Sequence, residues 1–98
     1  MIPGKPVAYP NPNTGVQVSI KFDLTRHATN VVVKMYTVSR RLVRQAGVDG
    51  TFEAGKCVVS LNREYLTGLS KGTYLYQLTA RDSQGREAKS KTGLLMIQ

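Results

Sequence analysis

The side chains that could carry out chemistry are few and scattered along this sequence. It contains a single histidine, His27, and a single cysteine, Cys57. Zinc sites take three or four such ligands, so these two residues do not suggest a metal centre. A nucleophilic cysteine needs an adjacent base in an accessible, electropositive setting. Cys57 instead falls on the apolar side of an alternating segment, and His27 lies in the polar stretch TRHATN. We interpret the cysteine as core filling and the histidine as a solvated loop residue.

The acidic side chains do not form a recognisable catalytic pair. Cleavage of a glycosidic bond needs two carboxyl groups facing each other across a cleft. Each of the six acids lies beside a predicted turn or on a predicted solvent face; they are Asp23, Asp49, Glu53, Glu64, Asp82 and Glu87. The stretch DSQG lacks the recurring acids and distal glutamate of a calcium loop, and the sequence contains no G-x-S-x-G, P-loop or G-x-G-x-x-G motif. We therefore predict a non-enzymatic protein with no catalytic residue, metal site or cofactor.

Basic residues dominate the charge of the chain. Fourteen lysines and arginines against six acids give a net charge of +8, which attracts polyanions such as nucleic acid or anionic glycan. A basic interaction surface is predicted from two groups: Arg40, Arg41 and Arg44 around one hairpin, and Lys89 and Lys91 near another. No RRM, KH or cold-shock motif is present, so specific nucleic-acid recognition is not predicted. A solvated outer face, or lysines that protect sheet edges, would account for the same residues, so polyanion binding is kept as an alternative.

The length of 98 residues predicts one domain, 1–98, without room for a second core. Its 41% hydrophobic and 20% charged residues are typical of a globular protein. No apolar run approaches the roughly 18 residues of a membrane span. The opening MIPGKPVAYP lacks the apolar region of a signal peptide. We expect a domain from the C-terminal part of a larger protein.

Alternation of apolar and polar residues predicts strands rather than helices. In GVQVSIKFDL, five apolar residues from Val16 to Leu24 fall on one face. Similar alternation marks NVVVKMYTV, KCVVSL and the stretch from Tyr74 to Ala80. We expect RLVRQA to be a short partner strand, KPVAY an edge strand in an extended segment 1–10, and EAKSKTGLLMIQ the last strand, with a bulge at Gly93. GVDGTFEAG and DSQG are expected to form turns, and NREYLTGLSKG to be irregular with one helical turn. About seven short strands predict an all-β, immunoglobulin-like antiparallel sandwich.

Several landmarks follow one another in the order seen in a known family. They are YPNPNTG, VSIKFDL, VKMYTVSRRLVR, AGKCVVSLN and LSKGTYLYQLTA. The more specific residues are Pro10, Asn11 and Pro12, then Gly72, Tyr74, Tyr76 and Leu78 of one strand. From about Tyr9 to its end the chain resembles the immunoglobulin-like domain of the FlgD type, found in flagellar hook-capping proteins. It is similar as well to the related C-terminal sorting domains of type IX secretion. It departs from the family at Thr37 and Arg40, which replace an acid and a glycine, so a different turn is expected there.

The resemblance implies a function in protein–protein contact outside the bacterial cell. The expected role is secretion sorting, surface attachment or assembly, with the secretion or assembly machinery, or the rest of the parent chain, as partner. An assembly domain of a flagellar hook cap is the alternative within this family. A partner strand could add to an available sheet edge by main-chain hydrogen bonds. The candidate surfaces are VAYP, RLVRQA and the basic terminal stretch 89–98.

Overall fold

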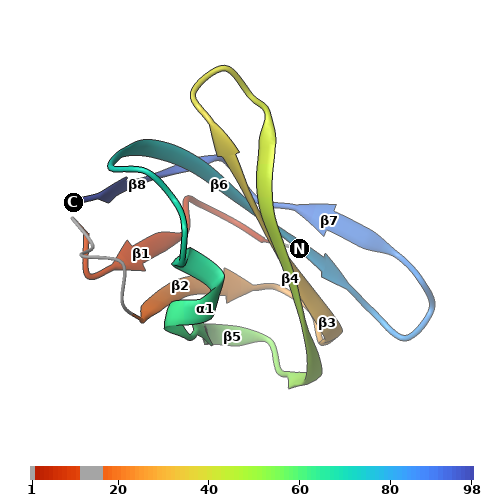
Figure 1. Ribbon diagram of the computed structural model, residues 1–98. Coiled ribbons are helices and arrows are strands. Elements are labelled where there is room, and N and C mark those ends of the chain that lie inside the picture. The colour runs from red at the N-terminus through yellow and green to blue at the C-terminus, as the bar shows by residue number, and fades with distance from the viewer. Residues whose placement is uncertain (1, 12–16) are drawn as a thin grey trace.

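The computed structural model describes residues 2–11 and 17–98, which form an almost entirely β architecture (Figure 1). Among these residues, eight strands and one short helix follow in chain order. They are β1 (Val7–Tyr9), β2 (Val18–Leu24), β3 (Ala28–Thr37), β4 (Leu42–Phe52), β5 (Gly55–Leu61), α1 (Arg63–Leu66), β6 (Gly72–Arg81), β7 (Glu87–Lys89) and β8 (Gly93–Ile97). The helical turn falls in the segment expected to be irregular. No helix of the described chain is long and apolar enough to cross a membrane.

The strands form two antiparallel sheets that pack as a sandwich. The three-stranded sheet has the order β1-β2-β5. The five-stranded sheet has the order β4-β3-β6, and both β7 and β8 pair with the far side of β6. In Figure 1 the β3–β4 hairpin projects at the top and the β6–β7 hairpin at the right, while β1 lies near β8. The predicted all-β sandwich is confirmed.

The core lies between the inner faces of the two sheets. In β2 the residues Val18, Ile20, Phe22 and Leu24 are buried, and the residues between them are exposed or half-buried. The opposite sheet contributes an equivalent set, and it consists of Val31, Val33, Met35, Tyr74, Tyr76, Leu78 and Ala80. These are the inward faces that the alternation predicts, because successive side chains of a strand point to opposite sides of its sheet.

Strand β4 is longer than the predicted RLVRQA, and the turn expected over GVDGTFEAG is confined to its end, at Glu53 and Ala54. The strand continues to Phe52 because β3 extends back to Ala28 and offers it a pairing partner along its whole length. Near this end Asn30 Nδ2 donates a hydrogen bond to Asp49 Oδ1 across the two strands, at 2.7 Å. Pairing with a long neighbour therefore overrides the turn preference of the glycines and aspartate.

The predicted last strand is two strands, which accounts for an eighth strand beyond the expected seven. Ser90 follows β7, and its hydroxyl accepts a hydrogen bond from the Leu78 amide at 2.9 Å. The Ser90 amide donates to the Leu78 carbonyl at 2.8 Å. The chain then re-enters the ladder at Gly93, opposite Tyr76. Gly93 thus begins β8 rather than forming a bulge within one continuous strand.

Candidate interaction surfaces

The tyrosines of the predicted signature belong to the framework of the sandwich. Tyr74 donates from its hydroxyl to the Ser70 carbonyl at 2.6 Å, four residues upstream, as in the tyrosine corner of immunoglobulin-like domains. Tyr76 donates from its hydroxyl to the Pro6 carbonyl at 2.9 Å, inside the core. Burial raises the pKa of Tyr76, which keeps this hydroxyl a donor. Leu78 is fully buried, and Gly72 enters the strand with a φ of 149°, a region that favours glycine.

Asn11 ties the N-terminal segment to the last strand. Its side-chain amide donates to the Leu94 carbonyl at 2.9 Å, and its side-chain oxygen accepts from the Met96 amide at 3.0 Å. The side chain of Asn11 therefore supplies one donor and one acceptor to the unpaired edge of β8, as the main chain of a neighbouring strand would. Pro10 follows a cis peptide bond from Tyr9, and Pro12 lies outside the described residues.

Arg44, which the sequence groups with Arg40 and Arg41, is half-buried, and its guanidinium is engaged by main-chain carbonyls. Its guanidinium donates to the carbonyls of Tyr65 at 3.1 Å, Thr67 at 2.6 Å and Val43 at 2.7 Å. Two of these carbonyls belong to α1 and the residue after it, so Arg44 fastens the short helix to β4. The five N–H donors of a guanidinium group have a fixed planar arrangement, which allows one arginine to bind several carbonyls at once.

The other predicted basic residues are exposed but lie apart. Arg40 and Arg41 occupy the turn between β3 and β4, with Arg40 at a φ of 70°. Lys89 lies in β7, which borders the five-stranded sheet on the side opposite β4, and Lys91 follows it. The predicted set therefore does not make one continuous patch.

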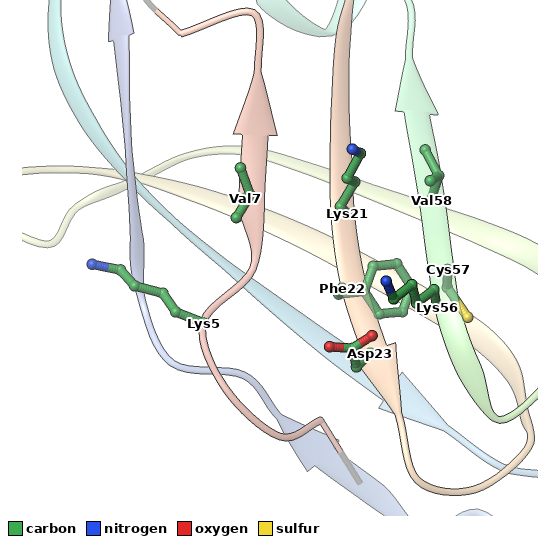
Figure 2. A pocket seen from close by; sticks show the side chains of 8 residues that line it. All are labelled: Lys5, Val7, Lys21, Phe22, Asp23, Lys56, Cys57 and Val58. Carbon is green, nitrogen blue, oxygen red and sulfur yellow. The ribbon is translucent and has the colours of Figure 1, made fainter.

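A shallow hollow of about 370 Å³ lies on the outer face of the three-stranded sheet (Figure 2). Val7, Lys21 and Val58 stand opposite one another across its three strands. Lys5 and Lys56 add two more cations, and Asp23 supplies a carboxylate. Figure 2 shows the Lys5 amine pointing away from those of Lys21 and Lys56. Because the three ammonium groups do not converge, the hollow is not built to hold one small anion.

The outer face of the five-stranded sheet carries a row of apolar side chains. Leu42, Tyr36, Leu75 and Leu94 stand directly opposite one another on β4, β3, β6 and β8. We call these four residues the apolar row. Alternation places Tyr36 and Leu75 on this face, but only the register between strands shows that the four line up. The row was therefore missed from the sequence.

The groups that could do chemistry are dispersed or structurally occupied. Within residues 2–11 and 17–98, no three His, Cys, Asp or Glu side chains gather closely enough to hold a metal ion. His27 is exposed in the β2–β3 turn. Burial raises the pKa of the Cys57 thiol, and the charge of Asp23 raises it further, while the thiol donates to the Glu53 carbonyl at 3.3 Å. A thiol with a raised pKa is a poor nucleophile.

Asp82 is the one buried carboxylate of the described chain, and it organises the turn after β6. Its oxygens accept hydrogen bonds from the amides of Gln84 and Arg86 at 2.9 Å, and from the Arg86 guanidinium at 2.8 Å. Burial by itself raises the pKa of Asp82, but these hydrogen bonds outweigh it and lower the pKa below its ordinary value. The carboxylate is thus a turn anchor.

Three solved structures share the fold of this chain at low sequence identity. FlgD from Xanthomonas campestris, whose structure concerns hook capping in flagellar assembly, aligns with a TM-score of 0.64 and 18% identity, over 96% of this chain and 65% of that chain. Dimeric latent PorU from Porphyromonas gingivalis aligns with a TM-score of 0.65 and 20% identity, over 96% of this chain and 9% of that one. FlgD from P. aeruginosa aligns with a TM-score of 0.64 and 18% identity, over 94% and 72%. The chain thus spans about two thirds of the Xanthomonas protein and a small part of PorU.

The comparisons by sequence assign the family. No curated protein matches the chain closely. The sequence model of the secretion system C-terminal sorting domain matches residues 7–90, from the start of β1 to the end of the β6–β7 hairpin. This match covers most of the chain, and the solved structures share its immunoglobulin-like sandwich. The chain therefore belongs to the C-terminal sorting domains of type IX secretion, a family with the FlgD-type immunoglobulin-like fold.

Proposed function

We propose that this chain is the sorting module of an exported bacterial protein, and that it directs its parent across the outer membrane through contacts with the secretion machinery. The observation that carries the proposal is the family match over residues 7–90, which takes in every strand of both sheets except β8. The parent protein would reach the cell surface or the medium. The module itself acts by binding and not by catalysis.

The form of the recognition signal follows from how the residues are used. Tyr74, Tyr76 and Asn11 are occupied by hydrogen bonds that hold the sandwich together. They act on recognition through the fold, because their hydrogen bonds stabilise the sandwich that presents the exposed surfaces. The machinery would then read exposed faces and edges of a folded domain rather than a linear peptide.

A reporter fusion tests the proposal. The chain is placed at the C-terminus of a fluorescent reporter that carries its own signal peptide for the inner membrane, and the fusion is expressed in a bacterium with type IX secretion. We expect the reporter at the cell surface or in the medium with the domain, and in the periplasm without it. Equal distribution of the two fusions would contradict a sorting role.

Polyanion binding is the second candidate, and the hollow in Figure 2 is the observation that favours it. Lys5, Lys21 and Lys56 are spread over one face, which suits an extended polyanion better than a single small anion. Affinity for heparin should fall steeply between low and physiological salt if only charge is involved. Retention on heparin at physiological salt, lost in a Lys21→Glu/Lys56→Glu variant, would favour this candidate. The hook-cap alternative is supported by likeness of fold alone.

A further inference from the structure

We propose that the apolar row is a docking surface for a protein partner whose own apolar segment is bordered by carboxylates. The inference rests on the proposed sorting function and names the surface through which it operates. The apolar row is Leu42, Tyr36, Leu75 and Leu94, one residue from each of four neighbouring strands.

The register between strands makes the row continuous. Tyr36 stands opposite Leu42 on one side and Leu75 on the other, and Leu75 stands opposite Leu94. Directly opposed side chains in a sheet have Cβ atoms about 5 Å apart, so they form one surface. Three strand spacings of about 4.8 Å give the row a length of about 14 Å. Met96, two residues beyond Leu94 on the same face of β8, is exposed and widens the row on the side of the β3–β4 turn.

The exposure of these residues is unusual for a small β domain. Leu42, Leu94 and Met96 are 47%, 53% and 43% exposed, although each is a large apolar side chain. The positions next to the row along the strands are polar and include Lys34, Gln45 and Gln77, and the next apolar residue on this face is Val32. Single exposed apolar residues need no explanation, but a contiguous group rimmed by polar residues marks an interaction site.

The surroundings of the row are cationic. Lys34 precedes Tyr36 by two residues on the same face, and Lys89 stands further along this face opposite Thr79. At the other border Lys91 precedes Leu94 by three residues. The acids nearest along this sheet, Asp49 and Glu87, are at its opposite end, where hydrogen bonds join them to Asn30 and Arg81.

Charge complementarity selects the partner. A second copy of this chain would bring the same cations and a net charge of +8 against the row, so self-association through it is opposed by repulsion. A different protein, with apolar side chains flanked by aspartate or glutamate, would bury the row and pair with Lys34 and Lys91. The apolar side chains would then supply most of the affinity, and the charged side chains would supply specificity and raise the association rate.

The reporter fusion described above, with matched variants, tests the inference. Leu94→Lys and Leu42→Lys each place a cation in the row, at opposite ends of it. Ser83→Lys is the control, because Ser83 is exposed in the β6–β7 turn, away from the apolar row and from the hollow of Figure 2. The Leu94 substitution keeps the main-chain carbonyl that Asn11 binds. Circular dichroism and thermal unfolding of the three purified domains establish that each is folded.

We expect Leu94→Lys and Leu42→Lys to lower export by about tenfold or more, as for loss of an interface anchor, and Ser83→Lys to export like wild type. Wild-type export by both row variants would overturn the docking surface while leaving the sorting function intact. Equal losses in all three would overturn it too, because added charge alone would explain them. Failure of the wild-type fusion to be exported would refute the sorting function, and the inference with it.

A second set of measurements distinguishes the kinds of partner that could occupy the apolar row. Lys34→Glu should lower export and Lys34→Arg should not. Equal export by both variants would refute the acidic border of the partner. Sedimentation of the purified domain should show a monomer. A dimer that disappears in Leu94→Lys would assign the row to self-association instead. Binding to phosphatidylglycerol vesicles that disappears in Leu94→Lys would assign the row to a lipid surface. Either result would overturn the proposed partner, which is a different protein with an acidic border.

Discussion

Gly93 lies against the ring of Tyr76, where a larger residue does not fit. A Cβ atom built on Gly93 would meet Cζ of the ring and would lie 2.6 Å from Oη and 2.7 Å from Cε1. Carbon atoms in favourable contact are about 3.5 to 4.0 Å apart, so the ring would have to move by about 1 Å. The ring is not free to do so. Tyr76 is 2% exposed, and its hydroxyl is held by the Pro6 carbonyl at 2.9 Å.

The cost of Gly93→Ala follows from these contacts. Overpacking of a close-packed core costs about 1–3 kcal/mol. A shift of the ring also stretches the hydrogen bond from Tyr76 and leaves the buried Pro6 carbonyl unsatisfied, which costs about 1–3 kcal/mol. Alanine recovers about 0.5–1 kcal/mol of chain entropy. We expect the free energy of unfolding to fall by about 2–4 kcal/mol, or the Tm by about 10–20 °C for a domain of this size.

Gly47→Ala is the matched control. Gly47 also lies in a strand of the five-stranded sheet, but a Cβ there would meet only Asn30 Nδ2 at 3.8 Å and Val32 Cγ2 at 3.9 Å, which are ordinary contacts. Urea unfolding of the two variants gives the comparison. Gly47→Ala should lie within about 1 kcal/mol of wild type. A difference between the two variants below about 0.5 kcal/mol would refute the account of this packing.

Three further predictions concern polar groups of the framework. Arg44→Ala should lower the free energy of unfolding by about 1–3 kcal/mol, because the carbonyls around α1 lose their hydrogen-bond donor. Arg41→Ala is the control and should change the free energy of unfolding by less than about 0.5 kcal/mol in the same urea titration. Equal effects of the two substitutions would count against the role given to Arg44. Hydrogen bonds lower the folded-state pKa of Asp82 below its unfolded value of about 3.9. The carboxylate therefore contributes fully to stability above that value, and the contribution is lost as the pH falls through the lowered pKa. Between about pH 6 and pH 2, the Tm of Asp82→Asn should fall less with decreasing pH than the Tm of wild type. Parallel plots of Tm against pH would contradict this. Because burial raises the pKa of Cys57, iodoacetamide at about pH 8 should modify the folded domain more slowly than the urea-unfolded chain, and equal rates would exclude a protected thiol.

The fold was predictable because its strands are patterned at short range. Alternation alone identifies the buried faces of β2, β3 and β6, since a one-residue slip would turn each apolar set outward. The end of β4 was not predictable, because glycine and aspartate there favour a turn and only pairing with β3 keeps them extended. The same holds for the division between β7 and β8, which depends on Ser90 and its hydrogen bonds to Leu78.

The candidate surfaces were less predictable than the fold, because they depend on which strands become neighbours. Arg44 reads as one more surface cation, and only the position of α1 reveals that its guanidinium is occupied. Asn11 and Leu94 are distant in sequence, so nothing local indicates that a side-chain amide covers the border of β8. The apolar row likewise arises from four strands, each contributing one residue that is unremarkable alone.

The central claim is that this folded domain is a signal for type IX export. The most direct measurement is the amount of reporter outside the cell for one fusion in two strains, one with the secretion system intact and one with it deleted. The account predicts reporter at the surface or in the medium of the intact strain, and reporter confined to the periplasm of the deleted strain. Export in both strains, or in neither, would contradict it.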